Sequence, residues 1–581
     1  MKKTILITVV LTIMTVFFGV CSHAAIEDCD FSDPKDGYID GGDLAQFAAY
    51  YAVGDPAANV DGVGDVDSDD VAHFAGFYGG TYAISARRPN ILLIIADDIG
   101  IDVTTDMYPG LITDLLALYG PEGHDNPNYL NIDGNPASTP VLNGLAQEGM
   151  RFSSASAQPV CSPTRAAIIT GLFADKTGVA SPGNPLSQNH ATFVQRMKDD
   201  ANYSTAMFGK WHLGTNSNGT LPKRAGFDLF RGNVQGAISP TFWSYGYHVQ
   251  DDATTNPDQY RTDSTPSKSL PGIASTTFAP VVKVADTIEW IEARQAEDPD
   301  KPWFAWLAFN EAHSPMHVPN ADTLNALSLA EVTGCGGVPG TTNRGSCTNK
   351  VLTRAMTNAM DTVIGKLLDA VASIPSDTYV IFVGDNGTDV STTNPNSLDN
   401  MYIDTSINGK GSVYESGSRV ALVVRGLGIA AGSASSEYVH VTDLYNTCLN
   451  LAGLPSETQN QDSSNQTVDS DSVSFTPILF GDATAVRDPN EGYILVETSY
   501  GGNKVGARNA RYKVVCSGSA SNCEFYDLVG GPLGVPLGDP LEVYPLSEPG
   551  SCTNYRTMYT TGDAGWHYCR LTEVVDMYSI F

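Results

Sequence analysis

The stretch RPNILLIIADDIG, residues 88–100, decides the fold. Its centre, Ile91 to Ala96, is an unbroken apolar run, which is typical of a strand buried on both faces of a sheet. Two acids, Asp97 and Asp98, follow this run directly. The stretch therefore predicts an inner strand of an α/β protein, with two carboxylates at its carboxyl end.

Helical patterns alternate with further apolar runs along the chain. VLNGLAQEGM (141–150) predicts a helix that leads into a strand, and VLTRAMTNAMDTVIGKLLDAVASI (351–374) predicts a long amphipathic helix. DTYVIFVGDNG (377–387) predicts a second buried strand, which ends in Asp385 and Asn386. This alternation of helices and buried strands predicts an α/β sandwich.

The two strand ends together form a candidate metal site, because sites in open α/β sheets form beyond the carboxyl ends of the strands. The candidate ligands are Asp97, Asp98, Asp385 and Asn386. A set of four oxygen ligands suits Ca²⁺ or Mg²⁺ better than zinc. Either pair taken alone is also what a turn or a helix cap uses, and this remains the alternative interpretation.

Several basic side chains stand in turn-like or glycine-rich settings that suit an anion. GKWHLG offers Lys210 and His212, which would point to one face if both lie in a strand. Lys410 stands between two glycines, where a backbone can approach a ligand closely. His313 and His317 have the spacing of a zinc-binding helix, but the neighbouring prolines disfavour a helix, so we do not expect zinc there.

The overall charge limits the classes of partner. The chain has 581 residues, with 33 Lys and Arg against 65 Asp and Glu, and a formal net charge of −32. Such an acidic exterior argues against nucleic acid as a partner, because phosphate binding needs clustered basic side chains. If the substrate is an anion, the basic residues that bind it must be gathered locally.

The cysteines predict an oxidising compartment. Six of the ten fall into local pairs that predict small disulfide loops: Cys335 with Cys347, Cys516 with Cys523, and Cys552 with Cys569. Cys448 lies in an apolar run and is expected to be a buried thiol. Cys161, in VCSPTRAAIITG, has no cysteine nearby and requires another explanation.

The first 24 residues predict a secretory signal peptide. Lys2 and Lys3 precede an apolar run, and Ser22-His23-Ala24 forms a small-x-small cleavage site. The apolar run is short for a bilayer, so an uncleaved membrane anchor is the weaker interpretation, and Cys21 leaves a lipoprotein open. We expect an exported protein, periplasmic or extracellular, without a transmembrane anchor.

An internal repeat follows the signal peptide. IDGGDLAQFAAYY (39–51) and VDSDDVAHFAGFY (66–78) align position for position, and each follows an acidic, glycine-containing segment. Oxygen ligands, a glycine turn and a following helix are the parts of an EF-hand-like loop. Residues 28–80 therefore resemble a dockerin-type calcium-binding repeat, although Val63 replaces an acidic ligand. The alternative is a surface helical hairpin with acidic turns. A scaffold or a cell surface is a possible binding partner of the repeat, and the sequence does not identify which.

Together, the motifs of the central region resemble the type I sulfatases of the alkaline-phosphatase superfamily. CSPTR matches their Cys-x-Pro-x-Arg signature, with Thr164 where the family more often has Ser, and GKWHLG matches the second signature. The segments that carry the resemblance are RPNILLIIADDIG (88–100), CSPTRAAIITG (161–171), GKWHLG (209–214), AFNEAHSP (308–315), VGDNG (383–387), GKGSVYESGSRV (409–420) and HVTDLYNTCLNLAGLP (440–455).

The resemblance covers residues 87–530 and implies a fold. The expected core, residues 87–455, is an alkaline-phosphatase-like α/β/α sandwich around a large mixed sheet. From residue 456 the sequence becomes polar and glycine-rich, with short strand-like runs such as GYILVET (492–498) and ARYKVVC (510–516). Residues 456–581 are therefore expected to form a smaller C-terminal α+β subdomain.

The resemblance also implies what Cys161 is for. In the family this cysteine is oxidised to Cα-formylglycine by a formylglycine-generating enzyme, and the hydrated aldehyde is the nucleophile. A sulfated diol can collapse to the aldehyde and expel sulfate, which a sulfated serine cannot. The implied activity is hydrolysis of a sulfate ester by an arylsulfatase-like enzyme, with a sulfated carbohydrate as a reasonable natural substrate.

The family's metal is usually Ca²⁺, with Mg²⁺ second. The implied ligands are Asp97, Asp98, Asp385, Asn386 and the modified residue 161, with a sulfate oxygen completing the shell. Three further residues are expected beside the site, as supporting or substrate-side groups: His317, Asp361 and Glu415.

The implied catalytic residues surround the modified cysteine. Arg165 would steady the aldehyde hydrate, Lys210 would bridge it to the sulfate, and His212 would accept a proton during its collapse. His313 and Lys410 would bind sulfate and help to protonate the leaving oxygen.

Two other functions are weighed against this one. A phosphomonoesterase or phosphodiesterase of the same fold would use Ser or Thr as the nucleophile and generally two zinc ions with more histidine ligands. A binding protein with a decayed core should have lost at least one motif residue, and none is missing.

Overall fold

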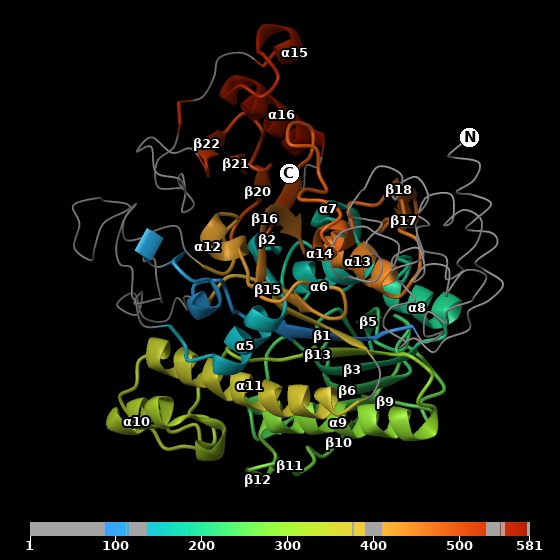
Figure 1. Ribbon diagram of the computed structural model, residues 1–581, viewed down its shortest axis with the longest axis vertical. Coiled ribbons are helices and arrows are strands. Elements are labelled where there is room, and N and C mark those ends of the chain that lie inside the picture. Colours follow the sequence, from blue (N-terminus) through green and yellow to red (C-terminus); the bar gives the residue numbers. More distant parts are fainter. Residues whose placement is uncertain are drawn as a thin grey trace, which may run out of the picture. The chain divides into compact units, whose positions relative to one another are not determined.

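β1 (Asn90–Ala96) lies near the centre of a ten-stranded mixed sheet (Figure 1). Its two neighbours, β13 (Trp303–Ala308) and β14 (Thr378–Gly384), both run parallel to it. All seven residues of β1 are buried. The two buried strands predicted from their apolar runs are therefore confirmed, and they are adjacent.

The structure is a computed structural model that describes residues 88–111, 113–114, 136–374, 377–389, 409–529, 546–547 and 552–577. The predicted signal peptide and calcium-binding repeat, with Cys21 and Cys29, lie outside the described residues. Residues 89–581 belong to one structural unit. The predicted border at residue 456 stays a prediction.

The large sheet combines parallel and antiparallel pairs, as expected for a mixed sheet. In spatial order its strands are β10 (Arg261–Asp263), β9 (Tyr247–Gln250), β6 (Leu229–Asn233), β3 (Ser204–Lys210), β13, β1, β14, β15 (Leu422–Arg425), β2 (Met150–Ser156) and β16 (Ser433–His440). The central five, from β6 to β14, are mutually parallel. Their carboxyl ends therefore meet at one edge, where a site is expected.

Helices cover both faces of the sheet (Figure 1). One face packs on α5 (Pro140–Glu148), α9 (Ala279–Glu297) and α11 (Asn349–Ala372). The other packs on α6 (Cys161–Thr170), α8 (Phe193–Ala201) and α13 (Asp443–Leu451). The predicted helices at 141–150 and 351–374 are thus confirmed, and the core is an α/β/α sandwich.

The side chains of β1 alternate between these two layers. Ile91, Leu93 and Ile95 belong to the hydrophobic cluster around α6, and the residues between them belong to the cluster around α9. Burying an aliphatic side chain of this size contributes about 1.5–3 kcal/mol. An apolar residue at every position is what a strand covered on both faces requires.

The C-terminal region forms a second, antiparallel sheet. Its order is β19 (Ile494–Thr498), β20 (Lys504–Arg508), β21 (Tyr512–Ser517) and β22 (Cys523–Asp527). α16 (Ala564–Met577) packs on it through Trp566 and Leu571, which share a hydrophobic cluster with Val514. An antiparallel sheet with a helix packed on it, separate in sequence from the strands, is typical of an α+β unit.

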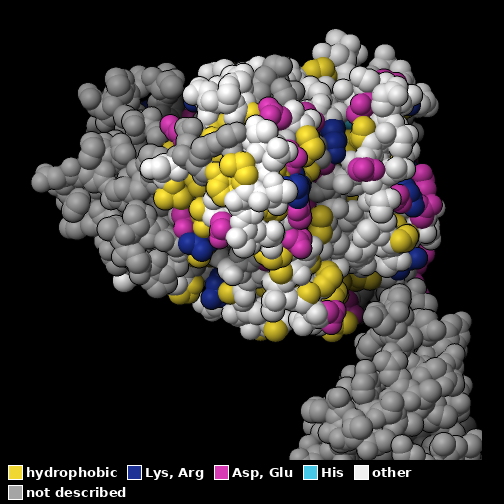
Figure 2. All heavy atoms as spheres, turned by 90° about the horizontal axis from the view of Figure 1, so that it is seen from above, with side chains coloured by type: hydrophobic (Ala, Val, Ile, Leu, Met, Phe, Trp, Pro, Cys, Tyr) yellow, Lys and Arg dark blue, Asp and Glu magenta, His cyan; other side chains and the backbone are white. Residues whose placement is uncertain are grey.

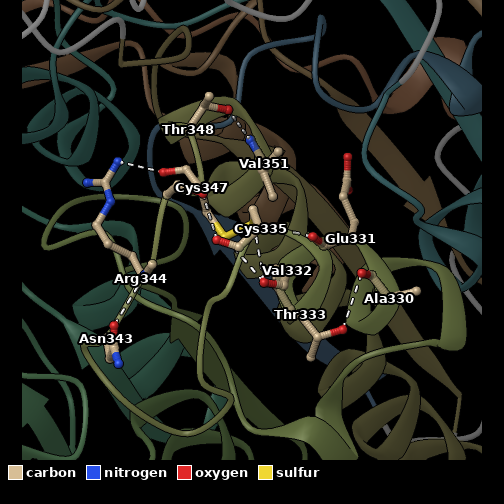
Figure 3. The surroundings of a disulfide bond; sticks show 12 residues. Ala330, Glu331, Val332, Thr333, Cys335, Asn343, Arg344, Cys347, Thr348 and Val351 are labelled. Carbon is tan, nitrogen blue, oxygen red and sulfur yellow. Dashed lines mark hydrogen bonds between the residues drawn. A yellow bond between two sulfur atoms is a disulfide. The ribbon is translucent and has the colours of Figure 1, made fainter.

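Three disulfides confirm the pairs expected from their spacing. They join Cys335 to Cys347, Cys516 to Cys523, and Cys552 to Cys569. Figure 3 shows the first, which links the end of α10 (Ala326–Gly334) to the residues just before α11. Cys161 and Cys448 are the free cysteines among the described residues, and both are buried.

The surface carries charges of both signs. In Figure 2, Lys and Arg side chains lie among Asp and Glu side chains over the described part of this face. Exposed ion pairs, such as Arg556–Glu491, occur among the described residues. Within the described ranges, no helix has both the length and the apolar character needed to cross a membrane.

Glu415, expected beside the site as a supporting or substrate-side group, forms two buried ion pairs. It begins α12 (Glu415–Ser418) and is buried, with one oxygen 2.9 Å from Arg508 and the other 2.9 Å from Lys513. Burial alone would raise its pKa, but Arg508, Lys513 and the nearby Arg419 together outweigh burial and lower the pKa to about 2. The ion pairs tie α12 to β20 and β21.

We therefore expect Glu415→Gln to destabilise the protein by about 3–5 kcal/mol at pH 7, because it leaves two buried cations without their carboxylate. The folded-state pKa lies below the value of about 4.3 for a free glutamic acid, so the stabilisation is complete above that pH. It is lost as the pH falls toward 2. Urea denaturation of the variant and the parent from pH 7 down to pH 3 measures both effects.

A matched control is Glu148→Gln, which removes an exposed partner of Arg425. It should cost less than about 1 kcal/mol. Equal stabilities of Glu415→Gln and the parent at pH 7 would contradict a stabilising role for these ion pairs between α12 and the C-terminal sheet.

Candidate active site

Cys161 is the first residue of α6, which begins just beyond the carboxyl ends of the central strands. The side chain is 1% exposed, and its Sγ lies 3.2 Å from Nδ1 of His212. Burial raises the pKa of the thiol, although Lys210 and Lys410 oppose this shift. An unmodified Cys161 is therefore held as a neutral thiol, a weak nucleophile.

Arg165 lies one helical turn after Cys161 on α6 and is fully buried. Its guanidinium donates to the carbonyl oxygen of Lys210 at 2.6 Å and to Oδ2 of Asp385 at 2.8 Å. It thus joins the start of α6 to the carboxyl ends of β3 and β14.

The predicted metal ligands do converge. Single oxygens of Asp97, Asp98 and Asp385 all lie within 4.8 Å of one another, and all three residues are buried. The backbone amide of Asp98 donates to Oδ1 of Asp385 at 3.1 Å, and Nδ2 of Asn386 donates to Oδ1 of Asp98 at 2.8 Å. The adjacency of β1 and β14 produces this cluster, because Ala96 pairs with Gly384, and Asp97 and Asp385 are the next residues of the two chains.

Buried oxygens without partners indicate that the cluster fits a cation. Oδ1 of Asp97, Oδ2 of Asp98 and Oδ1 of Asn386 are buried and accept no hydrogen bond. Buried polar atoms are nearly always paired, so three such atoms in one cluster require an explanation. Carboxylate and amide oxygens are the donors that Ca²⁺ and Mg²⁺ prefer. The alternative of a simple turn or helix cap leaves these oxygens unexplained.

The electrostatics of the cluster are consistent with a missing positive charge. Burial, together with the charge of Asp97, raises the pKa of Asp385 to about 7. Burial would also raise the pKa of Asp97, but Lys210, at 2.5 Å, and three other basic residues lower it overall. A divalent cation would relieve the remaining repulsion between the carboxylates.

The expectation that Lys210 and His212 point to one face of a strand is wrong. Lys210 is the last residue of β3, so the two residues do not share a strand face. His212 has a left-handed backbone, with φ of 64°, which turns its ring toward Cys161. Gly236 makes room for the ring, since a Cβ at that position would lie 2.4 Å from Cε1 of His212. Burial and the nearby Lys210 lower the pKa of His212 well below its usual value, so the imidazole is neutral.

Two partly exposed residues complete the cluster. Nζ of Lys410 lies 2.6 Å from Oδ1 of Asp98, and its neighbours Gly409 and Gly411 both have positive φ. Nε2 of His313 lies 3.9 Å from Oδ2 of Asp98, while its Nδ1 is 2.8 Å from the carbonyl oxygen of Ser314. The other ring nitrogen, Nε2, is thus directed to the cluster.

Two residues expected beside the site, His317 and Asp361, have contacts with residues outside the carboxylate cluster. His317 is buried against the rings of Phe242, Trp243 and Phe278. Asp361 accepts hydrogen bonds from the first turn of α5, at the backbone amides of residues 141 and 142. Both positions are explained by packing and helix capping. No helix forms over residues 313–317, so the rejection of a zinc helix is confirmed.

A cavity of 580 Å³ lies away from this cluster. Its lining includes Ser204 and Leu229, the first residues of β3 and β6, together with Trp290 of α9. It therefore opens at the amino ends of the strands, whereas the candidate site lies at their carboxyl ends.

Comparison with known proteins identifies the family. The sulfatase family model matches residues 89–454, so the chain belongs to the sulfatase family. It is 29% identical to mouse arylsulfatase J over 55% of this chain and 49% of the relative. It is 26% identical to mouse N-acetylgalactosamine-6-sulfatase over 63% of each. The match thus spans about half to two thirds of these relatives' lengths.

A solved structure shares the fold. The PsFucS1 sulfatase from Pseudoalteromonas sp. aligns with a TM-score of 0.53 and 20% identity, over 79% of this chain and 86% of that one. This likeness confirms the expected sulfatase fold around the mixed sheet.

The geometry predicts that Asp98→Asn weakens binding of a divalent cation by at least about 10- to 100-fold, because it removes charge from a ligand set with unpaired oxygens. Calorimetric titration of chelator-treated protein with Ca²⁺, and separately with Mg²⁺, measures the affinity. Asp361→Asn, which changes another buried carboxylate away from the cluster, should leave it unchanged. Equal affinities in all three proteins would contradict a cation site here.

Proposed function

We propose that this member of the sulfatase family hydrolyses sulfate esters, with residue 161 acting as formylglycine and with a divalent cation, Ca²⁺ rather than Mg²⁺. The observation that carries the proposal is the position of Cys161. The Sγ atom of Cys161 contacts the neutral ring of His212. Cys161 is on α6, and the same helix presents Arg165 to Asp385 of the carboxylate cluster. The cysteine of the Cys-x-Pro-x-Arg signature thus lies beside the carboxylate cluster, where the proposed reaction needs its nucleophile.

The cation would be held by Asp97, Asp98, Asp385, Asn386 and residue 161. Bound there, it would lower the pKa of the nucleophile and offset negative charge on the sulfuryl oxygens. Arg165 holds Asp385 and the carbonyl of Lys210 in place through two hydrogen bonds. The ligand set is therefore oriented by the chain's own residues.

The hydrated aldehyde supplies two hydroxyls on one carbon, one for attack on sulfur and one for release of sulfate. His212 suits the proton transfer of the release step. Its ring is neutral because burial lowers its pKa, and Nδ1 already lies within hydrogen-bond distance of the side chain at 161. A neutral imidazole at this atom can accept the second hydroxyl's proton.

Lys210, Lys410 and His313 are the basic residues that would bind the sulfate group of the substrate. Lys410 is 11% exposed and His313 is 16% exposed, so both can meet a substrate from the open side. A sulfate group could replace Asp98 as the partner of Lys410 or His313 and would then form a charge-assisted hydrogen bond with that residue. His313 is suited to protonate the leaving oxygen, because its Nε2 faces the cluster.

A sulfated carbohydrate is the substrate class we propose. A relative with this specificity in its name, N-acetylgalactosamine-6-sulfatase, matches 63% of the chain. Three disulfides suit an exported protein, periplasmic or extracellular, and a formylglycine-generating enzyme is the required partner for maturation. The calcium-binding role of residues 28–80 and its scaffold or surface partner are proposed from the sequence alone.

The all-oxygen ligand set and the cysteine favour a sulfatase over a phosphatase of the same fold. We expect turnover of 4-nitrophenyl sulfate to exceed that of 4-nitrophenyl phosphate in kcat/KM. Cys161→Ala should lower sulfatase kcat by at least about a thousandfold, because it removes the nucleophile. Assays of both substrates with both proteins, made in a host that has the converting enzyme, measure this.

Cys448→Ala is the matched control, since Cys448 is the other buried free cysteine of the described chain and lies in α13. It should keep the parent kcat. Preferred turnover of the phosphate, or full sulfatase activity in Cys161→Ala, would contradict the proposed function.

A further inference from the structure

A further buried lysine lies close to the strand ends that carry the candidate site. Lys283 belongs to α9, and its side chain is 2% exposed. Its Nζ donates to Oδ1 of Asn310 at 2.7 Å and lies 3.8 Å from Oε2 of Glu311, whose side chain is fully buried. Burial lowers the pKa of Lys283 to about 8 and raises the pKa of Glu311, and the attraction between the two groups opposes both shifts.

The pair lies where three central strands end. The aliphatic stem of Lys283 passes close to β3, since a Cβ at Gly209 would lie 3.3 Å from its Cδ. Glu311 follows β13, and its carbonyl oxygen accepts the backbone amide of Asp97, after β1, at 3.0 Å. The pair thus contacts the segments that end β3 and β13 and is hydrogen-bonded to the one that ends β1.

Each of these segments delivers a residue of the candidate site. Gly209 immediately precedes Lys210, Glu311 stands two residues before His313, and the third segment supplies Asp97 itself. Asn310 adds a further link, because its Nδ2 donates to the carbonyl oxygen of Gly236, next to the His212 ring. Asn310 and Glu311, the two partners of Lys283, stand on the same segment as His313, so a shift of the pair acts most directly on His313.

Stability alone does not account for two such charges. Replacing a buried ion pair by neutral groups of similar shape is often neutral or stabilising, because desolvation offsets the attraction. Here Oε1 of Glu311 is also buried without a hydrogen-bond partner, which adds to that cost. What an ion pair does provide is a fixed relative position of α9 and the segment after β13.

We propose that Lys283 and Glu311 are positioning residues, whose ion pair holds the 310–313 segment so that His313 is aligned to protonate the leaving oxygen. This inference rests on the proposed sulfatase function. It predicts a specific defect, because loss of proton donation slows departure of a poor leaving group far more than departure of a good one.

The test uses the full-length protein and three variants: Lys283→Met, Glu311→Gln and the double variant. Lys283→Met leaves Glu311 buried and unpaired, so it should be the least stable, and the double variant should recover stability in thermal denaturation. Initial rates are measured with 4-nitrophenyl sulfate, which has a good leaving group, and with phenyl sulfate, which has a poor one.

We expect kcat of the double variant to fall about 10- to 100-fold with phenyl sulfate and less than about threefold with 4-nitrophenyl sulfate. Glu311→Gln should show the same selectivity and provides the readout if the double variant does not fold. A purely structural role would instead lower both rates by the same factor, and that result would overturn the inference.

Arg487→Met is the matched control. Arg487 forms an equally buried pair with Asp443, at 2.6 Å, and neither residue contacts the candidate site. It should lose stability but keep the parent's ratio of the two rates. Absence of sulfate-ester turnover in the parent would overturn the proposed function as well, whereas turnover with an unchanged ratio in all variants would overturn this inference alone.

Discussion

The arrangement of this protein depends on compensating three carboxylates buried together at the carboxyl ends of two adjacent strands. Asp97, Asp98 and Asp385 lie within 4.8 Å of one another and away from water. Such a cluster is unfavourable unless cations meet it. Arg165 reaches it from α6, Lys210 from the end of β3 and Lys410 from a glycine-flanked loop. The unpaired oxygens that remain leave room for one more positive charge, which we assign to a divalent metal ion.

The same constraint brings the reactive groups together. Arg165 can reach Asp385 only if α6 begins at the strand ends, and this also delivers Cys161 to the cluster. Lys210 can reach Asp97 only if β3 ends beside β13 and β1, and the chain then turns His212 toward Cys161. The electrostatics that hold the fold together at this edge are therefore those that would bind a sulfate ester. Lys283 and Glu311 add a further buried ion pair close to the strand ends.

Much of this could be predicted from the sequence, because its signals are local. An unbroken apolar run ending in acids predicts both the strand and the position of its carboxylates, and close cysteine pairs predict short disulfide loops. Three features could not be predicted in this way. The left-handed turn at His212 depends on space left by Gly236, far along the chain. Glu415 stands in a family motif, yet its partners, Arg508 and Lys513, come from the distant C-terminal sheet. Lys283 lies within a helical pattern, where a single lysine normally indicates the solvent face, and only the fold reveals its burial.

The proposed catalytic mechanism requires that Cys161 is converted to formylglycine. The most direct measurement is the mass of the tryptic peptide from Phe152 to Arg165, taken from the protein made in a host that has the converting enzyme, with an aldehyde-reactive tag as a check. We predict a peptide in which one sulfur and two hydrogens are replaced by one oxygen, and which the tag labels. An unmodified cysteine in catalytically competent protein would contradict the account, because the proposed nucleophile would then be absent.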